Sequence, residues 1–291
     1  MEERRSDQDT ARRIAESAEL QLAPDGERYP VIDLKTTLSI SLENRVSMRH
    51  VETTALQQGV VPCRYLRNIG TIGVDGQLKL LESTVAIVGA GGLGGTAIEL
   101  LARLGAGHLI IIDDGRFADH NLNRQLMSAQ DNVGERKVTV AASRVSKVNC
   151  AVEVTAFGER LTNDNASRLL RGARAVVDGL DNLSSRFAVE HACRDLGIPY
   201  VYGTIAGFCG QLMTIYPGDP GLSCIYGSCR ADLEQGMESA TGNPATTPAL
   251  VAALQVQESV KIITGIGTPL RNRVLMVDVA HGTFDALELT R

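Results

Sequence analysis

The chain has 291 residues, which is enough for one large domain or two small ones. Its composition, with 44% hydrophobic and 22% charged residues, excludes a disordered protein and indicates a globular one. The net charge of -5, from 29 Lys and Arg against 34 Asp and Glu, argues against a protein that coats nucleic acid. Six cysteines are too few for a disulfide framework in a chain of this length. The first residues are polar and do not resemble a signal peptide, and no apolar run approaches the roughly 18 residues of a membrane helix. We therefore expect a cytoplasmic protein with no membrane partner.

The first 60 residues differ in pattern from the rest and are interpreted as an N-terminal appendage (residues 1–60). Apolar residues at helical spacing predict an amphipathic helix over residues 6–22, which Pro24-Asp25-Gly26 would end. Strand-like pieces follow at residues 29–34 and 38–42. A packing or dimerisation arm is favoured over a catalytic role for this appendage.

From residue 82 onward, short apolar runs alternate with segments of helical periodicity. Strands are expected at residues 84–89, 108–113, 152–156, 175–178 and 200–202, and helices at 93–104, 135–148, 163–171 and 183–196. This alternation predicts an α/β fold with a Rossmann-like, doubly wound, mainly parallel sheet. A C-terminal antiparallel extension is predicted from a strand at 211–216, a long helix at 248–264 and a hairpin of strands at 273–279 and 283–289.

A glycine-rich loop, Gly89-Ala-Gly91-Gly92-Leu-Gly94, directly follows the first of these strands and precedes a helix. Glycines there let the backbone turn tightly and approach a phosphate, whose negative charge is stabilised by a helix N-terminus. The motif predicts nucleotide binding. By itself it does not choose between a dinucleotide and ATP.

Charged residues after the second strand favour ATP over NAD. Asp113 ends that strand, at the position where a carboxylate meets ribose hydroxyl groups. Arg124 and Lys137 follow along the chain. Because a guanidinium and an ammonium suit a triphosphate better than a nicotinamide, these two residues indicate ATP.

Two aspartates at the end of the fourth strand are candidates for binding Mg²⁺. In a doubly wound sheet, ligands lie at the carboxyl ends of the strands, and Mg²⁺ prefers one or two carboxylates together with phosphate oxygens. Asp181 stands further from the strand than Asp178 and is the predicted ligand. Asp178 is the other aspartate at this strand end, and it could cap the following helix instead of binding the metal.

Several short motifs follow one another in a fixed order: Arg64-Tyr-Leu-Arg67-Asn, residues 72–81, the glycine loop, Asn121-Leu-Asn-Arg-Gln, Lys137, Leu180-Asp-Asn and Arg186. Together they resemble the ThiF/MoeB/HesA family, the bacterial relatives of ubiquitin-activating enzymes. The resemblance extends from about residue 64 to the C-terminus. Residues 61–291 are therefore interpreted as one ThiF/MoeB-type, ATP-binding adenylation domain.

The resemblance implies an adenylyltransferase that uses MgATP to activate the C-terminal Gly-Gly carboxylate of a small ubiquitin-fold protein of the sulfur-carrier type. It implies that Asp113 holds the ribose and that Asp181 binds Mg²⁺. Arg124 and Lys137 would bind phosphates, which Asn121 would help to orient.

The resemblance also implies a homodimer with composite sites. Arg67, the second arginine of its motif, would reach into the site of the partner subunit. The catalytic set implied in this way comprises Arg67, Arg124, Lys137 and Asp181.

The cysteines depart from the family pattern. Many relatives carry two Cys-x-x-Cys pairs that bind a structural zinc ion, whereas this chain has only Cys224 and Cys229 near the first pair and none near its last residues, so zinc is not expected. Relatives that transfer the acyl group to a thiol place a cysteine in the loop before the long helix, and residues 235–248 contain none. Whether Cys209, Cys224 or Cys229 takes part in transfer stays open.

Other functions compete with activation of a sulfur carrier. A microcin-type enzyme would activate a short ribosomal precursor peptide and could use residues 1–60 as a clamp. A tRNA threonylcarbamoyladenosine dehydratase-type enzyme would activate a carboxylate on RNA, which the net charge disfavours without excluding tRNA. A nucleotide-binding scaffold would have lost the transfer step, and an NAD-linked oxidoreductase would leave Arg124, Lys137 and Asp181 without a role.

Overall fold

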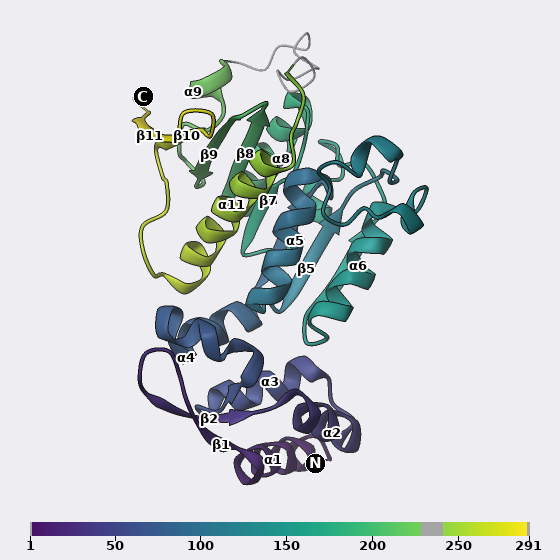
Figure 1. Cartoon of the computed structure of the whole chain (residues 1–291), viewed down its shortest axis with the longest axis vertical. Helices are drawn as coiled ribbons and strands as arrows, with labels where there is room; N and C mark the ends of the chain where they lie inside the picture. Colours follow the sequence, from purple (N-terminus) through teal and green to yellow (C-terminus); the bar gives the residue numbers. More distant parts are fainter. Residues whose placement is uncertain (1, 228–240, 290–291) are drawn as a thin grey trace.

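The computed structural model describes residues 2–227 and 241–289. An N-terminal segment lies at one end of the long axis, and a domain with a large central sheet occupies the remainder (Figure 1). The helix α4 (Leu66–Glu82) lies between these two parts.

The central sheet has eight strands in the order β11-β10-β9-β8-β7-β4-β5-β6. Their bounds are β4 (Thr84–Val88), β5 (His108–Ile112), β6 (Glu153–Phe157), β7 (Ala175–Asp178), β8 (Tyr200–Ala206), β9 (Cys209–Ile215), β10 (Arg273–Asp278) and β11 (Thr283–Glu288). The five strands from β8 to β6 are parallel, and β9, β10 and β11 add to them in antiparallel fashion. The predicted Rossmann-like, doubly wound sheet with its C-terminal antiparallel extension is confirmed.

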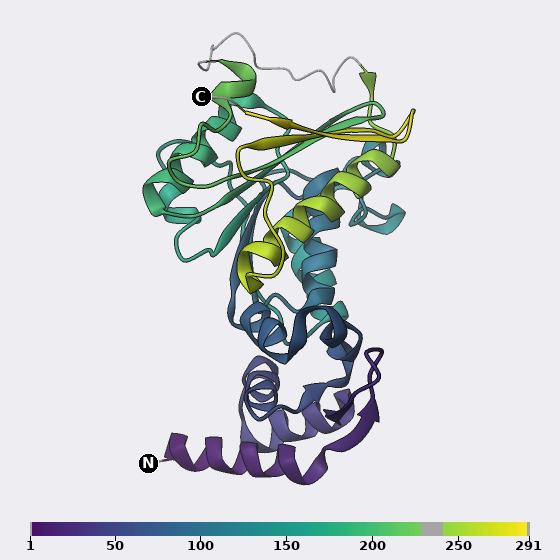
Figure 2. The ribbon, with the colours of Figure 1, turned by 90° about the vertical axis from the view of Figure 1, so that its left-hand side faces the viewer.

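Helices cover both faces of this sheet. One layer contains α5 (Gly92–Leu104), α6 (Lys137–Val148) and α11 (Thr246–Thr264), and α5 and α11 lie side by side in both views (Figure 1, Figure 2). The other layer contains α7 (Ala166–Leu169) and α8 (Leu183–Leu196), and the short helix α9 (Ser223–Tyr226) packs on the same side. Along β4, Val85 and Ile87 pack in the first layer and Ala86 and Val88 in the second. Because both faces are buried, the strands read as continuous apolar runs in the sequence.

The N-terminal segment has a three-stranded sheet of its own, in the order β1-β2-β3. Its elements are α1 (Glu2–Ser17), β1 (Glu19–Leu22), β2 (Arg28–Ile32), α2 (Leu34–Asn44), α3 (Met48–Gln57) and β3 (Val61–Pro62). A separate small core holds them together, formed by Ile14, Ile32, Ile40, Val51, Ala55 and Val60. Since Val61 pairs with Val31, this sheet uses residues beyond position 60. The division of the chain at residue 60 stays a prediction.

Two expectations for this segment differ from the structure. The first helix ends at Ser17, and residues 19–22 of the expected helix form β1. The strand expected at residues 38–42 is wrong, because these residues lie in α2. The helix begins where the Asp33 carboxylate accepts a hydrogen bond from the N–H of Thr36 at 2.7 Å, and it buries Thr37 and Ile40 at helical spacing.

A buried polar cluster joins the N-terminal segment to the domain. The Tyr65 hydroxyl donates to the Glu52 carboxylate of α3 at 2.9 Å, and the Asn149 amide donates to the Tyr65 oxygen at 2.9 Å and to the carbonyl of Ala102 at 3.0 Å. Arg64 pairs with the same Glu52. Burial raises the pKa of Glu52 although Arg64 opposes this shift. The contacts tie α3 to α5 and to the end of α6, so the N-terminal segment is fixed on the domain.

Candidate nucleotide-binding site

A cavity of ≈ 370 Å³ opens at the carboxyl ends of β4, β5 and β7, against the start of α5. Ligands of doubly wound sheets lie at this edge, and a cavity of this size is typical of small-molecule sites. The charged and polar side chains that line it are Asp113, Asp114, Arg124, Gln125, Lys137, Glu159, Arg160, Asp181, Asn182, Ser185, Arg186, Thr204 and Asn243.

The glycine loop packs closely against neighbouring backbone and also lines the cavity. At Gly89, whose φ is +92°, an added Cβ would lie 2.4 Å from the carbonyl oxygen of Gly179, and at Gly94 it would lie 1.7 Å from the carbonyl oxygen of Gly89. These two glycines let three backbone segments pack together. Gly89, Gly91 and Gly92 line the cavity, and a Cβ at Gly91 would meet nothing nearer than 3.6 Å. The open side of the loop therefore leaves room for a ligand at the N-terminus of α5.

Two of the predicted cations converge on the cavity. Lys137 begins α6, where its backbone N–H donates to the carbonyl of Gly115 at 3.1 Å. The Arg124 guanidinium donates to the carbonyl of His120 and to the side chain of Asn123, both at 2.9 Å. Arg124 and Lys137 line the same cavity as Gly92 at the start of α5, so their positive charge and the helix N-terminus are both available to a bound polyphosphate.

Arg160 and Arg186 also line the cavity. Arg160 was not among the residues singled out in the sequence, and Arg186 carried no assigned role there. Arg160 follows β6, whose carboxyl end meets this edge of the sheet because β6 is parallel to β5. The only sequence signal for Arg160 was therefore its place after a parallel strand.

Asp113 lines the cavity and also holds the glycine loop in place. One of its carboxylate oxygens accepts from the N–H of Ala90 and the other from the N–H of Gly115, both at 2.7 Å. The contact of Asp113 with a ribose stays a prediction.

Asn121 is not brought to the cavity. Its side chain is buried, and its amide oxygen accepts from the N–H of Ala118 at 3.0 Å. It thereby shapes the turn that precedes Arg124. The spacing of the motif could not reveal this, since the amide is equally suited to a phosphate or to a backbone N–H.

The two candidate aspartates for Mg²⁺ have opposite surroundings. Asp178 is fully buried, and its carboxylate accepts from Arg186 Nε at 3.1 Å and from the N–H of Leu180 at 2.8 Å. Burial alone would lower the pKa of Arg186, but the negative charge of Asp178 opposes this shift, and the pKa of the guanidinium is raised. Asp181 is exposed and lines the cavity. Asp181 therefore has a carboxylate oxygen available to a metal ion, whereas Asp178 is committed to Arg186.

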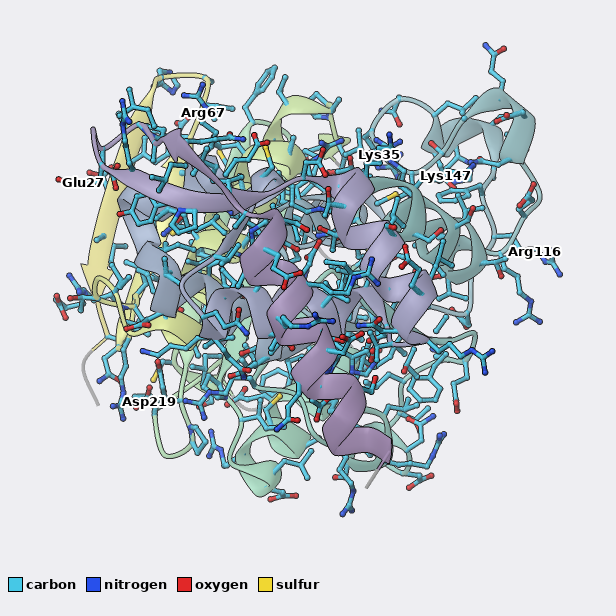
Figure 3. The ribbon with its side chains drawn as sticks, turned by 90° about the horizontal axis from the view of Figure 1, so that it is seen from below. Glu27, Lys35, Arg67, Arg116, Lys147 and Asp219 are labelled. Carbon is cyan, nitrogen blue, oxygen red and sulfur yellow. The ribbon has the colours of Figure 1, made fainter. Side chains whose placement is uncertain are left out.

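Arg67 lies away from the cavity of its own chain. It is exposed near the start of α4, and Figure 3 shows it at the surface beside the N-terminal segment. Within one chain the structure brings Arg124, Lys137 and Asp181 together, and it does not bring Arg67 to them.

The cysteines singled out in the sequence that the structure describes do not line this cavity. Cys209 and Cys224 are exposed and do not line it, and Cys229 lies outside the described residues. Within residues 2–227 and 241–289, no group of three His, Cys, Asp or Glu side chains could hold a metal ion. In the same part of the chain, no helix is both long enough and apolar enough to cross a membrane.

Comparison with known proteins agrees with this geometry. The model of the ThiF family matches residues 65–291. The SAMP-activating enzyme E1 of Haloferax volcanii is 35% identical over 226 residues, which cover 77% of this chain and 84% of that protein. The sulfur carrier protein adenylyltransferase of Thermus thermophilus is 34% identical over 228 residues, which cover 76% of this chain and 83% of that protein.

Among solved structures, Escherichia coli MccB with ATP superposes with a TM-score of 0.68 at 22% identity, over 87% of this chain and 82% of that one. At this identity the likeness supports the fold alone. The chain belongs to the ThiF family, as the order of its motifs indicated.

Proposed function

We propose that this protein is an ATP-dependent adenylyltransferase that activates the C-terminal carboxylate of a small ubiquitin-like sulfur-carrier protein. The observation that carries the proposal is that Arg124, Lys137 and Asp181 line the same cavity as the glycine loop. Relatives named as a SAMP-activating E1 enzyme and a sulfur carrier protein adenylyltransferase support the class of substrate.

The reaction needs a held triphosphate and an ionised nucleophile. The carrier carboxylate attacks the α-phosphorus of ATP, a carboxyl–phosphate bond forms, and the bond to pyrophosphate breaks, so that carrier adenylate and pyrophosphate result. No general base is required, because a C-terminal carboxylate is ionised at neutral pH. Arg124 and Lys137 neutralise the charge that develops on the phosphates, and the N-terminus of α5 adds its partial positive charge.

Mg²⁺ would be held by Asp181, whose exposed carboxylate suits a hard cation shared with phosphate oxygens. The ion would add charge neutralisation at the leaving pyrophosphate. Asp113 fits the ribose. It directly follows β5 and contacts the glycine loop, and a carboxylate in this place meets the ribose hydroxyl groups in doubly wound folds.

The test is ATP–pyrophosphate exchange in the presence of a ubiquitin-fold carrier that ends in Gly-Gly. Replacing one transition-state charge contact costs about 10²–10³ in rate, so Lys137→Ala is expected to reduce exchange by about that factor. Lys147→Ala is the matched control, because it removes the same charge from the other end of α6. Full exchange by Lys137→Ala, or no exchange by the unmodified protein with any such carrier, would contradict the proposal.

A further inference from the structure

The strand β1 forms an open edge of the N-terminal sheet. It pairs with β2 on one side, in the antiparallel register that places Leu20 opposite Pro30 and Leu22 opposite Arg28. In the sheet order β1-β2-β3, no strand from residues 2–227 or 241–289 lies on its other side. An open strand edge offers unpaired N–H and C=O groups to another extended chain.

The register decides which backbone groups face that open side. Antiparallel pairs alternate between hydrogen-bonded and non-hydrogen-bonded, and Pro30 has no N–H to donate to Leu20. The N–H of Ala23 donates to the carbonyl of Glu27 at 2.8 Å, so that pair is a bonded one. Counting back from it, Leu22 and Leu20 belong to non-bonded pairs. Their N–H and C=O groups therefore point away from β2, toward the open edge.

The side chains of the same two residues are also free. Leu20 and Leu22 are each 67% exposed, and because they are two positions apart they lie on one face of the strand. Natural sheet edges are usually protected by lysine, proline or a bulge, whereas this edge carries two leucines. Backbone groups and apolar side chains are thus offered together at one place.

The charge around the edge indicates what can bind there. The hairpin formed by β1 and β2 carries the three carboxylates Glu19, Asp25 and Glu27 against the one guanidinium of Arg28. The hairpin lies on the outside of the N-terminal segment (Figure 2, Figure 3). A binding strand that alternates apolar residues with Lys or Arg would match both the leucines and this negative charge.

We propose that β1 binds an extended segment of another protein as an additional strand, with apolar residues against Leu20 and Leu22 and basic residues facing Glu19. The segment is recognised by backbone hydrogen bonds to Leu20 and Leu22 and by alternate side chains, as in other cases of strand addition. The adenylation reaction plays no part in this binding, so the two proposals stand or fall separately.

The probe is a fluorescein-labelled Lys-Val-Lys-Val-Lys-Val-Lys peptide, and fluorescence anisotropy with the full chain is the measurement. Leu20→Pro removes the free N–H of position 20, which β2 does not use, and Leu20→Lys with Leu22→Lys removes the apolar contacts and adds positive charge. Each is expected to raise the Kd of the peptide at least ten-fold. Leu42→Lys is the matched control, because Leu42 is 76% exposed on α2 outside the strand edge, and it is expected to leave the Kd unchanged.

Circular dichroism and thermal unfolding of each variant show whether it is folded, and the double lysine variant leaves the backbone of β1 intact should Leu20→Pro unfold. No binding to the unmodified chain, or an equal Kd for the double lysine variant, would overturn the proposal. Light scattering tests the alternative that a second copy of this chain covers β1. A lower molar mass for the double lysine variant than for the unmodified chain would show this, and it would also overturn the proposal.

Discussion

At the residue scale, the glycine loop separates folding from ligand binding within six positions. Gly94 is required because neighbouring backbone lies closer than a Cβ permits, whereas Gly91 lines the cavity and has room for a Cβ; Gly89 lies close to backbone and also lines the cavity. The spacing of the glycines in the sequence does not show which of them pack against neighbouring backbone.

A pair of alanine substitutions tests the distinction. Gly94→Ala would place a Cβ 1.7 Å from the carbonyl of Gly89, so we expect it to lower the free energy of unfolding by several kcal/mol, in the upper range for single substitutions. Gly91→Ala meets nothing nearer than 3.6 Å, so we expect a nearly unchanged melting temperature and weaker ATP binding.

Urea unfolding and calorimetric titration with ATP measure the two effects. A stable Gly94→Ala protein, or Gly91→Ala protein that binds ATP like the unmodified chain, would contradict the assignment.

At the scale of elements, Glu99 joins two helices of the nucleotide-binding half. It lies on α5 with a side chain only 7% exposed, and it accepts hydrogen bonds from Arg103 of the same helix and from Arg144 of α6, the latter at 2.8 Å. Burial would raise the pKa of Glu99, but the hydrogen bonds from Arg144 and Arg103 outweigh it and hold the pKa below its usual value. The carboxylate therefore stabilises the folded state while it is ionised.

The lowered pKa of Glu99 fixes the sign of a pH effect. A carboxyl group that ionises more readily when folded stabilises the protein above its unfolded pKa of about 4.3, and this contribution is lost as the pH falls through the folded value. We expect Glu99→Gln to reduce stability by about 1 kcal/mol at pH 7, since both arginines are about half exposed.

Urea unfolding from pH 7 down to pH 3.5 should show this difference shrinking below about pH 4. Asp131→Asn, at an exposed position, serves as the control for loss of one charge. If the difference in unfolding free energy between Glu99→Gln and the unmodified chain stays constant over this range, the ionised Glu99 does not stabilise the contact between α5 and α6.

At the scale of the whole molecule, we propose that the active form is a homodimer in which Arg67 completes the site of the partner subunit. Arg67 is exposed and lies apart from the cavity of its own chain, so it can act on a phosphate only across an interface. The proposal rests on this separation and on the motif that carries Arg67.

Subunit mixing tests the composite site. Arg67→Ala and Asp181→Ala chains are each expected to be impaired in ATP–pyrophosphate exchange, and a mixed dimer would contain one site with both residues intact. We expect mixtures of exchanging subunits to recover up to about a quarter of the unmodified rate, since in an equal mixture half of the dimers are hybrids and each hybrid has one intact site of two. Exchange of subunits without any recovery would show that Arg67 does not act in trans.

The sequence by itself determined the order of the fold and identified several of the residues that line the cavity. Apolar runs alternating with helical periodicity identified the parallel sheet, because strands buried on both faces and helices with one apolar stripe leave distinct patterns along the chain. The glycine loop and Asp181 were predicted from their place after a strand end, and Arg124 and Lys137 from the charge that a triphosphate needs; the structure places all of them on the lining of one cavity.

Only the tertiary structure decided how the local groups are used. Asn121 carries an amide that could face a phosphate, but it is buried against its own turn, and Arg160 reaches the cavity because β6 lies beside β5. Residues 38–42 were strand-like by local pattern, yet packing of Ile40 in the N-terminal core made them helical. These outcomes depend on contacts between residues far apart along the chain, and neither spacing nor residue type records which contacts will form.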